Sequence, residues 1–160
     1  LGRVSNLPTV WSNCLAAWLL GGGGDWTRFG VLCAGATGLY LGGMFLTPAQ
    51  GTTGPMTFAI RSNTVAEKRF AAPGSLPTGW HHTAVVIDAA AMTATVYLDG
   101  SAVSSSSVAM LPKDMGVTNQ NWIGRSQFTA DAFFNGAVDD FRIYNRALSA
   151  PEIRYLAGDR

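Results

Sequence analysis

The sequence predicts an all-β protein, a two-sheet antiparallel β-sandwich or jelly roll with one short C-terminal helix. Nearly every segment is a short run rich in β-branched and aromatic residues, bounded by Gly, Pro, Asn, Asp or Ser. Only the C-terminal end carries a convincing helix signal. Because 48% of the 160 residues are hydrophobic, the chain can bury one sizeable core. We therefore expect a single domain over residues 1–160.

The predicted strands follow one another along the chain with turn residues between them. Residues 93–103 alternate polar and apolar side chains and then turn at Asp99 and Gly100, which favours a type I′ hairpin. The serines at 104–107 form either a polar loop or an exposed edge strand. The strand-like runs lie at 9–20, 26–34, 39–47, 55–62, 82–89, 92–100, 121–126 and 137–144.

The predicted helix begins near residue 150 and is short, about two turns. Ser149 can be its N-cap, and Glu152 lies three residues later, which is the spacing of a capping box. Pro151 is tolerated because the first turn of a helix does not need its N–H.

Two cysteines lie in the first two predicted strands. If residues 13–20 and 27–34 form an antiparallel hairpin around the loop GGGGDW, Cys14 and Cys33 face each other. A cross-strand disulfide is then geometrically possible and would suit a secreted protein. The alternative is two free buried thiols.

The charge pattern argues against nucleic acid and anionic membranes as partners. There are 11 Lys and Arg against 10 Asp and Glu, a net charge of +1, and the basic residues are scattered. Residues 31–49 carry no charge, but their glycines and Pro48 predict strands and not a membrane span. Because the sequence begins at Leu1, we expect a piece of a longer polypeptide.

Two adjacent aspartates, Asp139 and Asp140, fall in a predicted buried strand. Neighbouring strand residues face opposite sides, so one carboxylate would point inward and would need a cation, an arginine or several N–H donors. One hypothesis is a structural Ca²⁺, with Asp139 as the favoured ligand and Asp140 paired at the surface. The alternative is a salt bridge to Arg142, Arg125 or Arg146, or an aspartate that caps a turn.

The sequence predicts no catalytic residues. Its two glutamates, Glu67 and Glu152, are far apart, and no carboxylate pair occupies alternate positions of a strand, as glycoside hydrolysis would favour. His81 and His82 face opposite sides of a strand and cannot easily chelate one metal. We expect Trp80 and His82 in the core and His81 at the surface. There is no G-x-S-x-G nucleophile motif.

Candidate ligand-binding residues concentrate between residues 119 and 135. Aromatic rings can stack on sugars, and Asn, Gln, Asp and Arg can hydrogen-bond hydroxyl groups. The alternative is that Trp122 and Phe134 belong to the core and that Arg125 pairs with Asp131. The candidates in this segment are Asn121, Trp122, Arg125, Gln127, Phe128 and Asp131, with Phe133 beside them; Trp26 and Tyr40, next to glycine-rich turns, are two more.

Three stretches of the chain resemble a known family. GWHHTAVVIDAAAMTATVYLDGSAV, NWIGRSQF and FNGAVDDFRIYNRALSAPEI resemble the laminin G-like, concanavalin A-like jelly-roll domains that bacteria attach to secreted glycoside hydrolases. The resemblance covers roughly residues 10–157. It implies two packed antiparallel sheets, often a structural Ca²⁺, and a carbohydrate-binding or ancillary role. The acidic strand cluster of the related glucanases is missing, and only Arg125 and Gln127 resemble the residues of the related lyases.

From these observations we expect a non-catalytic carbohydrate-binding module of a secreted bacterial enzyme. It would hold a tethered catalytic domain near its polysaccharide. The alternative is a structural domain that packs on the catalytic domain without binding sugar, and a large exposed apolar patch would favour it. A lyase or hydrolase is the third hypothesis.

Overall fold

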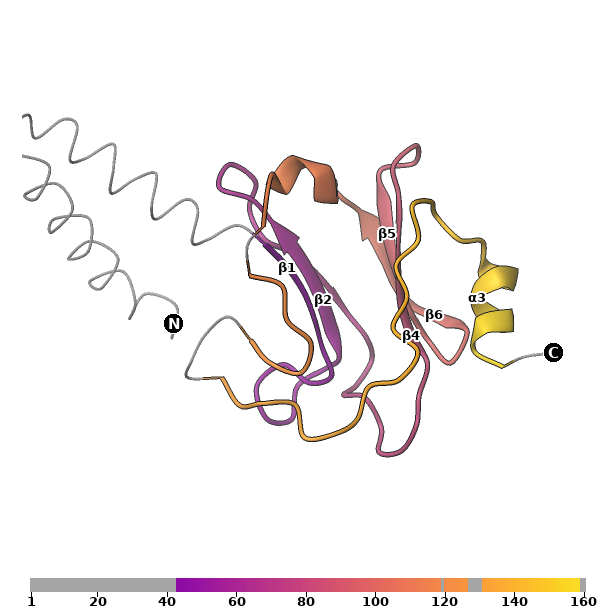
Figure 1. Cartoon of the computed structure of the whole chain (residues 1–160). Coiled ribbons are helices and arrows are strands. Elements are labelled where there is room, and N and C mark those ends of the chain that lie inside the picture. The colour runs from indigo at the N-terminus through magenta and orange to yellow at the C-terminus, as the bar shows by residue number, and fades with distance from the viewer. Residues whose placement is uncertain (1–42, 119, 127–130, 159–160) are drawn as a thin grey trace, which may run out of the picture.

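The computed structural model describes residues 43–118, 120–126 and 131–158, which include two antiparallel sheets of three strands each (Figure 1). The first sheet contains β1 (Gly43–Thr47), β2 (Thr57–Arg61) and β3 (Lys68–Ala71) in that order. The second sheet contains β4 (Thr83–Asp88), β5 (Thr93–Leu98) and β6 (Ser101–Ser107). A short 3₁₀ turn, η2 (Pro112–Met115), and the helix α3 (Ala150–Leu156) complete the regular elements of the described residues.

The hairpin from β5 to β6 confirms the turn that the sequence predicts. Asp99 and Gly100 both have positive φ, 49° and 79°, as a type I′ turn requires. Leu98 pairs with Ser101 across this turn, and the serine run belongs to β6, so the edge-strand alternative holds within the described sheet.

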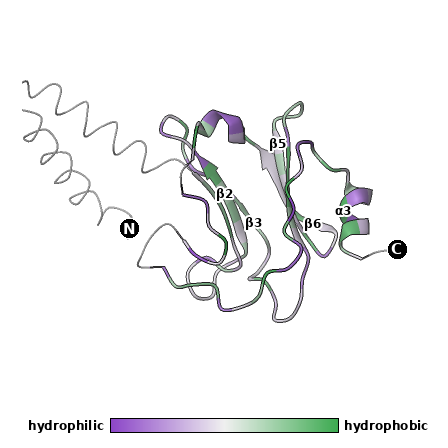
Figure 2. Ribbon diagram, viewed as in Figure 1, coloured by the Kyte–Doolittle hydropathy of each residue, from purple (hydrophilic) through white to green (hydrophobic). Residues whose placement is uncertain are grey.

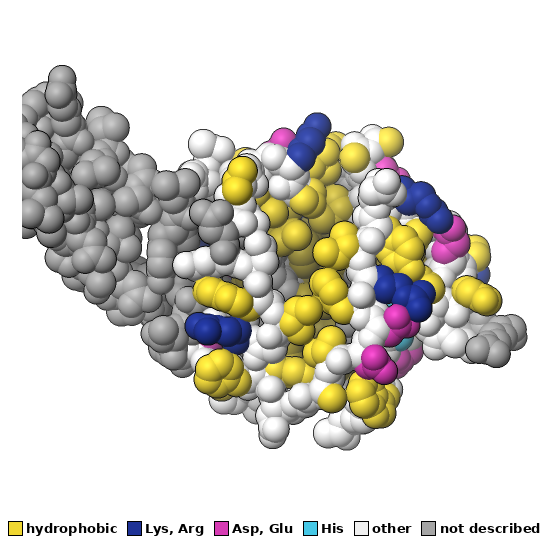
Figure 3. Space-filling view, in the orientation of Figure 1, with side chains coloured by type: hydrophobic (Ala, Val, Ile, Leu, Met, Phe, Trp, Pro, Cys, Tyr) yellow, Lys and Arg dark blue, Asp and Glu magenta, His cyan; other side chains and the backbone are white. Residues whose placement is uncertain are grey.

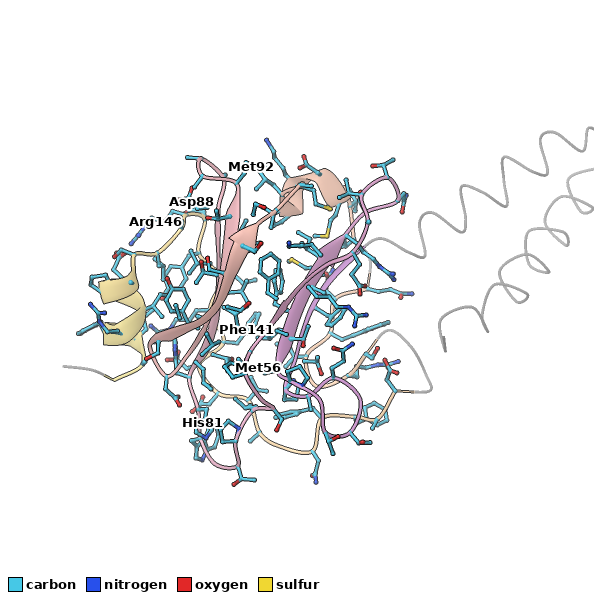
Figure 4. The ribbon with its side chains drawn as sticks, turned by 180° about the vertical axis from the view of Figure 1, so that it is seen from behind. Met56, His81, Asp88, Met92, Phe141 and Arg146 are labelled. Carbon is cyan, nitrogen blue, oxygen red and sulfur yellow. The ribbon has the colours of Figure 1, made fainter. Side chains whose placement is uncertain are left out.

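The two sheets pack face to face over an apolar core, with hydrophobic strands on both sides of the gap (Figure 2). Phe58 and Phe70 of the first sheet lie with their ring centroids 5.7 Å apart. Ala94 and Val96 of β5 face them from the second sheet. Met56, which lies between the sheets in Figure 4, is almost fully buried. This burial of apolar surface confirms the β-sandwich.

The outer face of the second sheet is covered by α3. Leu148 and Ile153 form a second buried cluster with Tyr97, and Ala84 and Val86 of β4 pack against it. Alternation along β4 therefore sends side chains to both faces of this sheet, and both faces are covered.

The helix begins as the sequence predicts. Glu152 Oε2 accepts hydrogen bonds of 2.8 Å from both the main-chain N–H and the hydroxyl group of Ser149. The capping box is therefore confirmed, with Pro151 in the first turn.

Several expectations about strands are wrong. Residues 121–126 and 137–144 form no strand, because the described residues offer them no neighbour with which to pair main-chain groups. The short strand β3 was not expected. The strands and the disulfide predicted before residue 43 lie outside the described residues.

No helix within the described residues is long and apolar enough to cross a membrane.

Candidate functional site

The most prominent polar and aromatic cluster lies in the loop that follows η2. The Arg125 guanidinium lies 4.5 Å from the ring centroid of Trp122 and 5.9 Å from that of Phe133. These distances are typical of cation–π contacts. Trp122 is 41% exposed and Phe133 is 74% exposed, so both rings remain available to solvent.

Local hydrogen bonds give this loop a defined shape. The Asn121 side chain bonds Thr118 twice, through Thr118 Oγ1 and the Thr118 carbonyl, each at 3.0 Å. Further along, the Phe134 N–H donates to the Gly124 carbonyl at 2.8 Å, which places these two residues side by side. Gly124 has a φ of +80°, a conformation that favours glycine. The loop is thereby folded on itself, so Trp122 and Phe133 approach the same guanidinium.

The Arg125 charge has no carboxylate partner within the part of the chain that the structure describes. Asp131 is exposed and forms no ion pair with Arg125 among these residues, so the alternative in which Arg125 pairs with Asp131 is not found. Trp122 and Phe134 are exposed and therefore are not core residues. A guanidinium carries five N–H donors, and among the described residues one of those on Arg125 is bonded, to the Ser126 carbonyl.

The structure brings together only part of the predicted ligand-binding set. Trp122 and Arg125 form the centre of the site, and Asn121 holds its first turn. Gln127, Phe128, Trp26 and Tyr40 lie outside the described residues. Their part in binding stays a prediction, as does that of Asp131.

The two aspartates of the C-terminal segment are exposed and not directed into a core. Asp140 forms a two-point ion pair with Arg142, with both N···O distances at 2.8 Å. Asp139 accepts a hydrogen bond from the Asp140 N–H at 2.8 Å. The expectation of a buried carboxylate is wrong, because the segment has no sheet beside it and Asp140 has a φ of +52°.

Calcium binding stays a prediction. Arg142 already occupies both oxygens of Asp140, and among the described residues no three His, Cys, Asp or Glu side chains gather where a metal could bind. A Ca²⁺ ion at Asp139 would therefore depend on main-chain carbonyl oxygens for most of its ligands.

A second polar cluster was missed by the sequence reasoning. His81 Nδ1 lies 2.8 Å from Asp99 Oδ2, and the His82 N–H donates to Asp99 Oδ1 at 2.9 Å. Asp99 therefore ties the hairpin turn to the segment before β4. Trp80 is 74% exposed, and the expectation that it is a core residue is wrong. It precedes β4, so strand alternation does not govern its direction.

The pKa values of this pair shift in opposite directions. The hydrogen bond to Asp99 raises the pKa of His81 above the ordinary histidine value. Partial burial acts to raise the pKa of Asp99, but the hydrogen bonds from His81 and from the His82 N–H together lower it. The pair is therefore held mainly as an imidazolium and a carboxylate at mildly acidic pH.

The chain matches the model of a family described as the concanavalin A-like lectin/glucanases superfamily, of laminin G type, over residues 6–154. Among solved structures, an S-layer domain-containing protein from Clostridium thermocellum is 35% identical, with a TM-score of 0.45. That match covers 65% of this chain and 52% of the other, so it spans about half the length of that solved chain. No curated protein matches the chain.

Proposed function

Because this chain belongs to the concanavalin A-like lectin/glucanase superfamily, we propose that it is a non-catalytic carbohydrate-binding module. The observation that supports this function best is the contact of the exposed Arg125 guanidinium with the rings of both Trp122 and Phe133. Aromatic rings offer flat apolar faces to the C–H groups of a pyranose ring, and the guanidinium offers donors to its hydroxyl oxygens.

The positive charge of Arg125 favours an acidic sugar as the ligand of the loop. The described residues place no carboxylate within ion-pair distance of its guanidinium, so the loop favours a ligand that is rich in oxygen acceptors. Uronate-containing polysaccharides offer carboxylates in addition to hydroxyl groups. We therefore expect the loop to bind acidic polysaccharides more tightly than neutral ones.

The module would act by mass action. Binding with an affinity of roughly micromolar to millimolar, about 4 to 8 kcal/mol, is enough to keep a tethered catalytic domain near an insoluble polymer. The chain would then be part of a secreted bacterial protein that also carries the catalytic domain. The module itself would break no bond.

The test is a titration of the purified chain with soluble acidic polysaccharides, followed by affinity electrophoresis. We expect Trp122→Ala and Arg125→Ala each to weaken binding roughly tenfold, because each removes one of the two kinds of contact. Trp80→Ala and Arg154→Ala are matched controls, since they replace an exposed tryptophan and an exposed arginine outside the loop. A loss in Trp80→Ala but not in Trp122→Ala would move the site to the segment before β4.

One observation favours a second candidate function, packing on a partner domain without sugar binding. Val138, Phe141 and Ile143 are exposed on the segment that precedes α3, and apolar side chains gather on the face that Figure 3 shows. Between described residues, positions 135–148 form no main-chain to main-chain hydrogen bond. A segment with exposed apolar side chains and few main-chain hydrogen bonds within the described residues is suited to an added strand or a covering surface.

Amide hydrogen exchange separates this second function from the first. The exchange of residues 137–144 would be compared between the isolated chain and the longer polypeptide that carries it. Protection that appears only in the longer polypeptide would support packing on a partner domain. Equal exchange in both would leave carbohydrate binding as the function.

A further inference from the structure

A cleft of about 390 Å³ lies between α3 and the chain segment that leads into it. Its floor is apolar and includes Leu148 and Leu156, and two tyrosines, Tyr144 and Tyr155, line it from the segment and from the helix. The ion pair of Arg146 and Glu152 completes its wall. Small-molecule sites typically enclose about 300 to 1,000 Å³, with mostly apolar linings and a few fixed polar groups. This cleft has a volume in that range and a mostly apolar lining, and it is widely open to solvent.

We infer that this cleft is a second sugar-binding site, selective for a neutral sugar ring. The inference rests on the proposed function, but it concerns a different surface and a different class of sugar. The cleft lies beside α3, on the outer side of the second sheet, whereas the Arg125 loop passes beside the first sheet (Figure 1).

The two tyrosines supply the stacking surface. Tyr155 is 68% exposed although it belongs to a helix that packs on the sheet through Ile153. Tyr144 is also exposed, lines the same cleft and comes from the segment that leads into α3. Tyrosine offers a large amphipathic ring at low entropic cost, so rings from two separate elements can contact one pyranose.

The ion pair leaves the lining of the cleft electrically balanced, with both side chains partly exposed. Two guanidinium nitrogens of Arg146 donate to the two carboxylate oxygens of Glu152, at 3.0 and 2.6 Å. Ser149 adds two more donors to the same carboxylate. The hydrogen bonds from Arg146, followed by those from Ser149, lower the pKa of Glu152 to about 2. The wall therefore stays ionised and internally paired at any ordinary pH.

Because Arg146 and Glu152 neutralise each other, the cleft favours an uncharged ligand. An anionic sugar would have to compete with Glu152 for Arg146, and a cationic group would have to compete with Arg146 for Glu152. A neutral hexose or pentose would not have to break this ion pair, and its hydroxyl groups could still hydrogen-bond the outer edges of the Arg146 and Glu152 side chains. Arg125 has no such carboxylate within the described residues, so the two sites differ in the sugar they favour.

The test is a titration of the isotope-labelled full chain with neutral oligosaccharides, cello-, xylo- and manno-oligosaccharides in turn, followed by NMR. We expect shifts at residues 144–156 and a roughly tenfold weaker affinity in Tyr155→Ala. Tyr155→Phe keeps the ring and should retain most of the affinity. Arg154→Ala, an exposed substitution in the same helix, is the matched control.

The outcomes distinguish this inference from the proposed function. Shifts at 144–156 that persist in Trp122→Ala would support a separate neutral-sugar site. Shifts confined to residues 116–134 would overturn the inference and leave the loop site intact. No shift with any neutral or acidic sugar would overturn both. If Tyr155→Ala loses the NMR signals of the folded helix, Tyr144→Ala would be tested in its place, and the same outcomes would apply to it.

Discussion

The substitution Ile153→Ala tests how α3, and with it the cleft, is held on the sandwich. Ile153 is 1% exposed and is the buried side chain of this helix. It packs with Tyr97 and Leu148 on the outer face of the second sheet. Other residues of α3, such as Arg154 and Tyr155, point away from this contact and are exposed. Helix docking should therefore depend strongly on one side chain.

The expected loss follows from the burial. Ile→Ala removes three carbon atoms, and about 0.8 kcal/mol per buried methylene gives about 2.4 kcal/mol before any cavity is counted. Measured Ile→Ala changes in cores run from about 2 to 5 kcal/mol. A helix of seven residues has little stability of its own, so loss of its anchor should release it. We expect about 2 to 4 kcal/mol.

Urea unfolding gives the change in the free energy of unfolding, and amide exchange of residues 150–156 shows whether the helix is released. The control Arg154→Ala should change stability by less than about 0.5 kcal/mol. A loss below about 1 kcal/mol in Ile153→Ala, with helix protection unchanged, would refute the assignment of Ile153 as the anchor. Neutral-sugar affinity at the cleft should fall with the helix, while binding at the loop should not.

Four further predictions concern the turn, the surface ion pair, calcium and pH. Gly100→Ala should destabilise the chain by at least about 1 kcal/mol in thermal unfolding, because φ is +79° and a Cβ would lie 3.2 Å from the Cα of Arg154; an unchanged midpoint would contradict that close approach. Asp140→Asn should cost less than about 1 kcal/mol in urea unfolding, since its pair with Arg142 is exposed, and a larger loss would mean that it binds something more. If Asp139 binds Ca²⁺, the unfolding midpoint should be higher with Ca²⁺ than with chelator and should lose this difference in Asp139→Asn; no difference would remove the calcium hypothesis. Because the pKa of Glu152 is lowered from about 4.5 to about 2 in the fold, its ionised form stabilises the protein fully above about pH 4.5. This contribution should be lost as the pH falls from about 4.5 to 2, and Glu152→Gln should abolish this part of the acid dependence.

Local signals in the sequence were sufficient for two elements. The alternation of residues 93–98 and the Asp99–Gly100 pair specify a hairpin through neighbouring residues alone. Ser149 and Glu152 likewise specify the start of α3, because a capping box needs only four consecutive residues.

Strand pairing was harder to predict, because a strand needs a neighbour. Residues 137–144 alternate as a strand would, yet the described residues give them no partner, and Asp140 turns the chain with a φ of +52°. The opposite error occurred at β3, where Lys68 and Arg69 are exposed and Phe70 alone points into the core. A single inward side chain leaves little periodicity to detect.

The candidate site was predictable in composition but not in geometry. Residue types identified Trp122 and Arg125 as candidates. The contact of Arg125 with Phe133 depends on the loop closing between Gly124 and Phe134, which no local pattern specifies. The cleft is not predictable for a related reason, since its lining depends on how α3 lies against the segment before it, which no local pattern specifies.

The most direct test of the central claim is retention of the full chain on a panel of acidic and neutral polysaccharides, with product analysis of the same samples. Carbohydrate binding without catalysis predicts retention on at least one polymer, weakened in Trp122→Ala, with no new reducing ends or unsaturated products. Absence of retention across the whole panel, or the appearance of cleavage products, would contradict it.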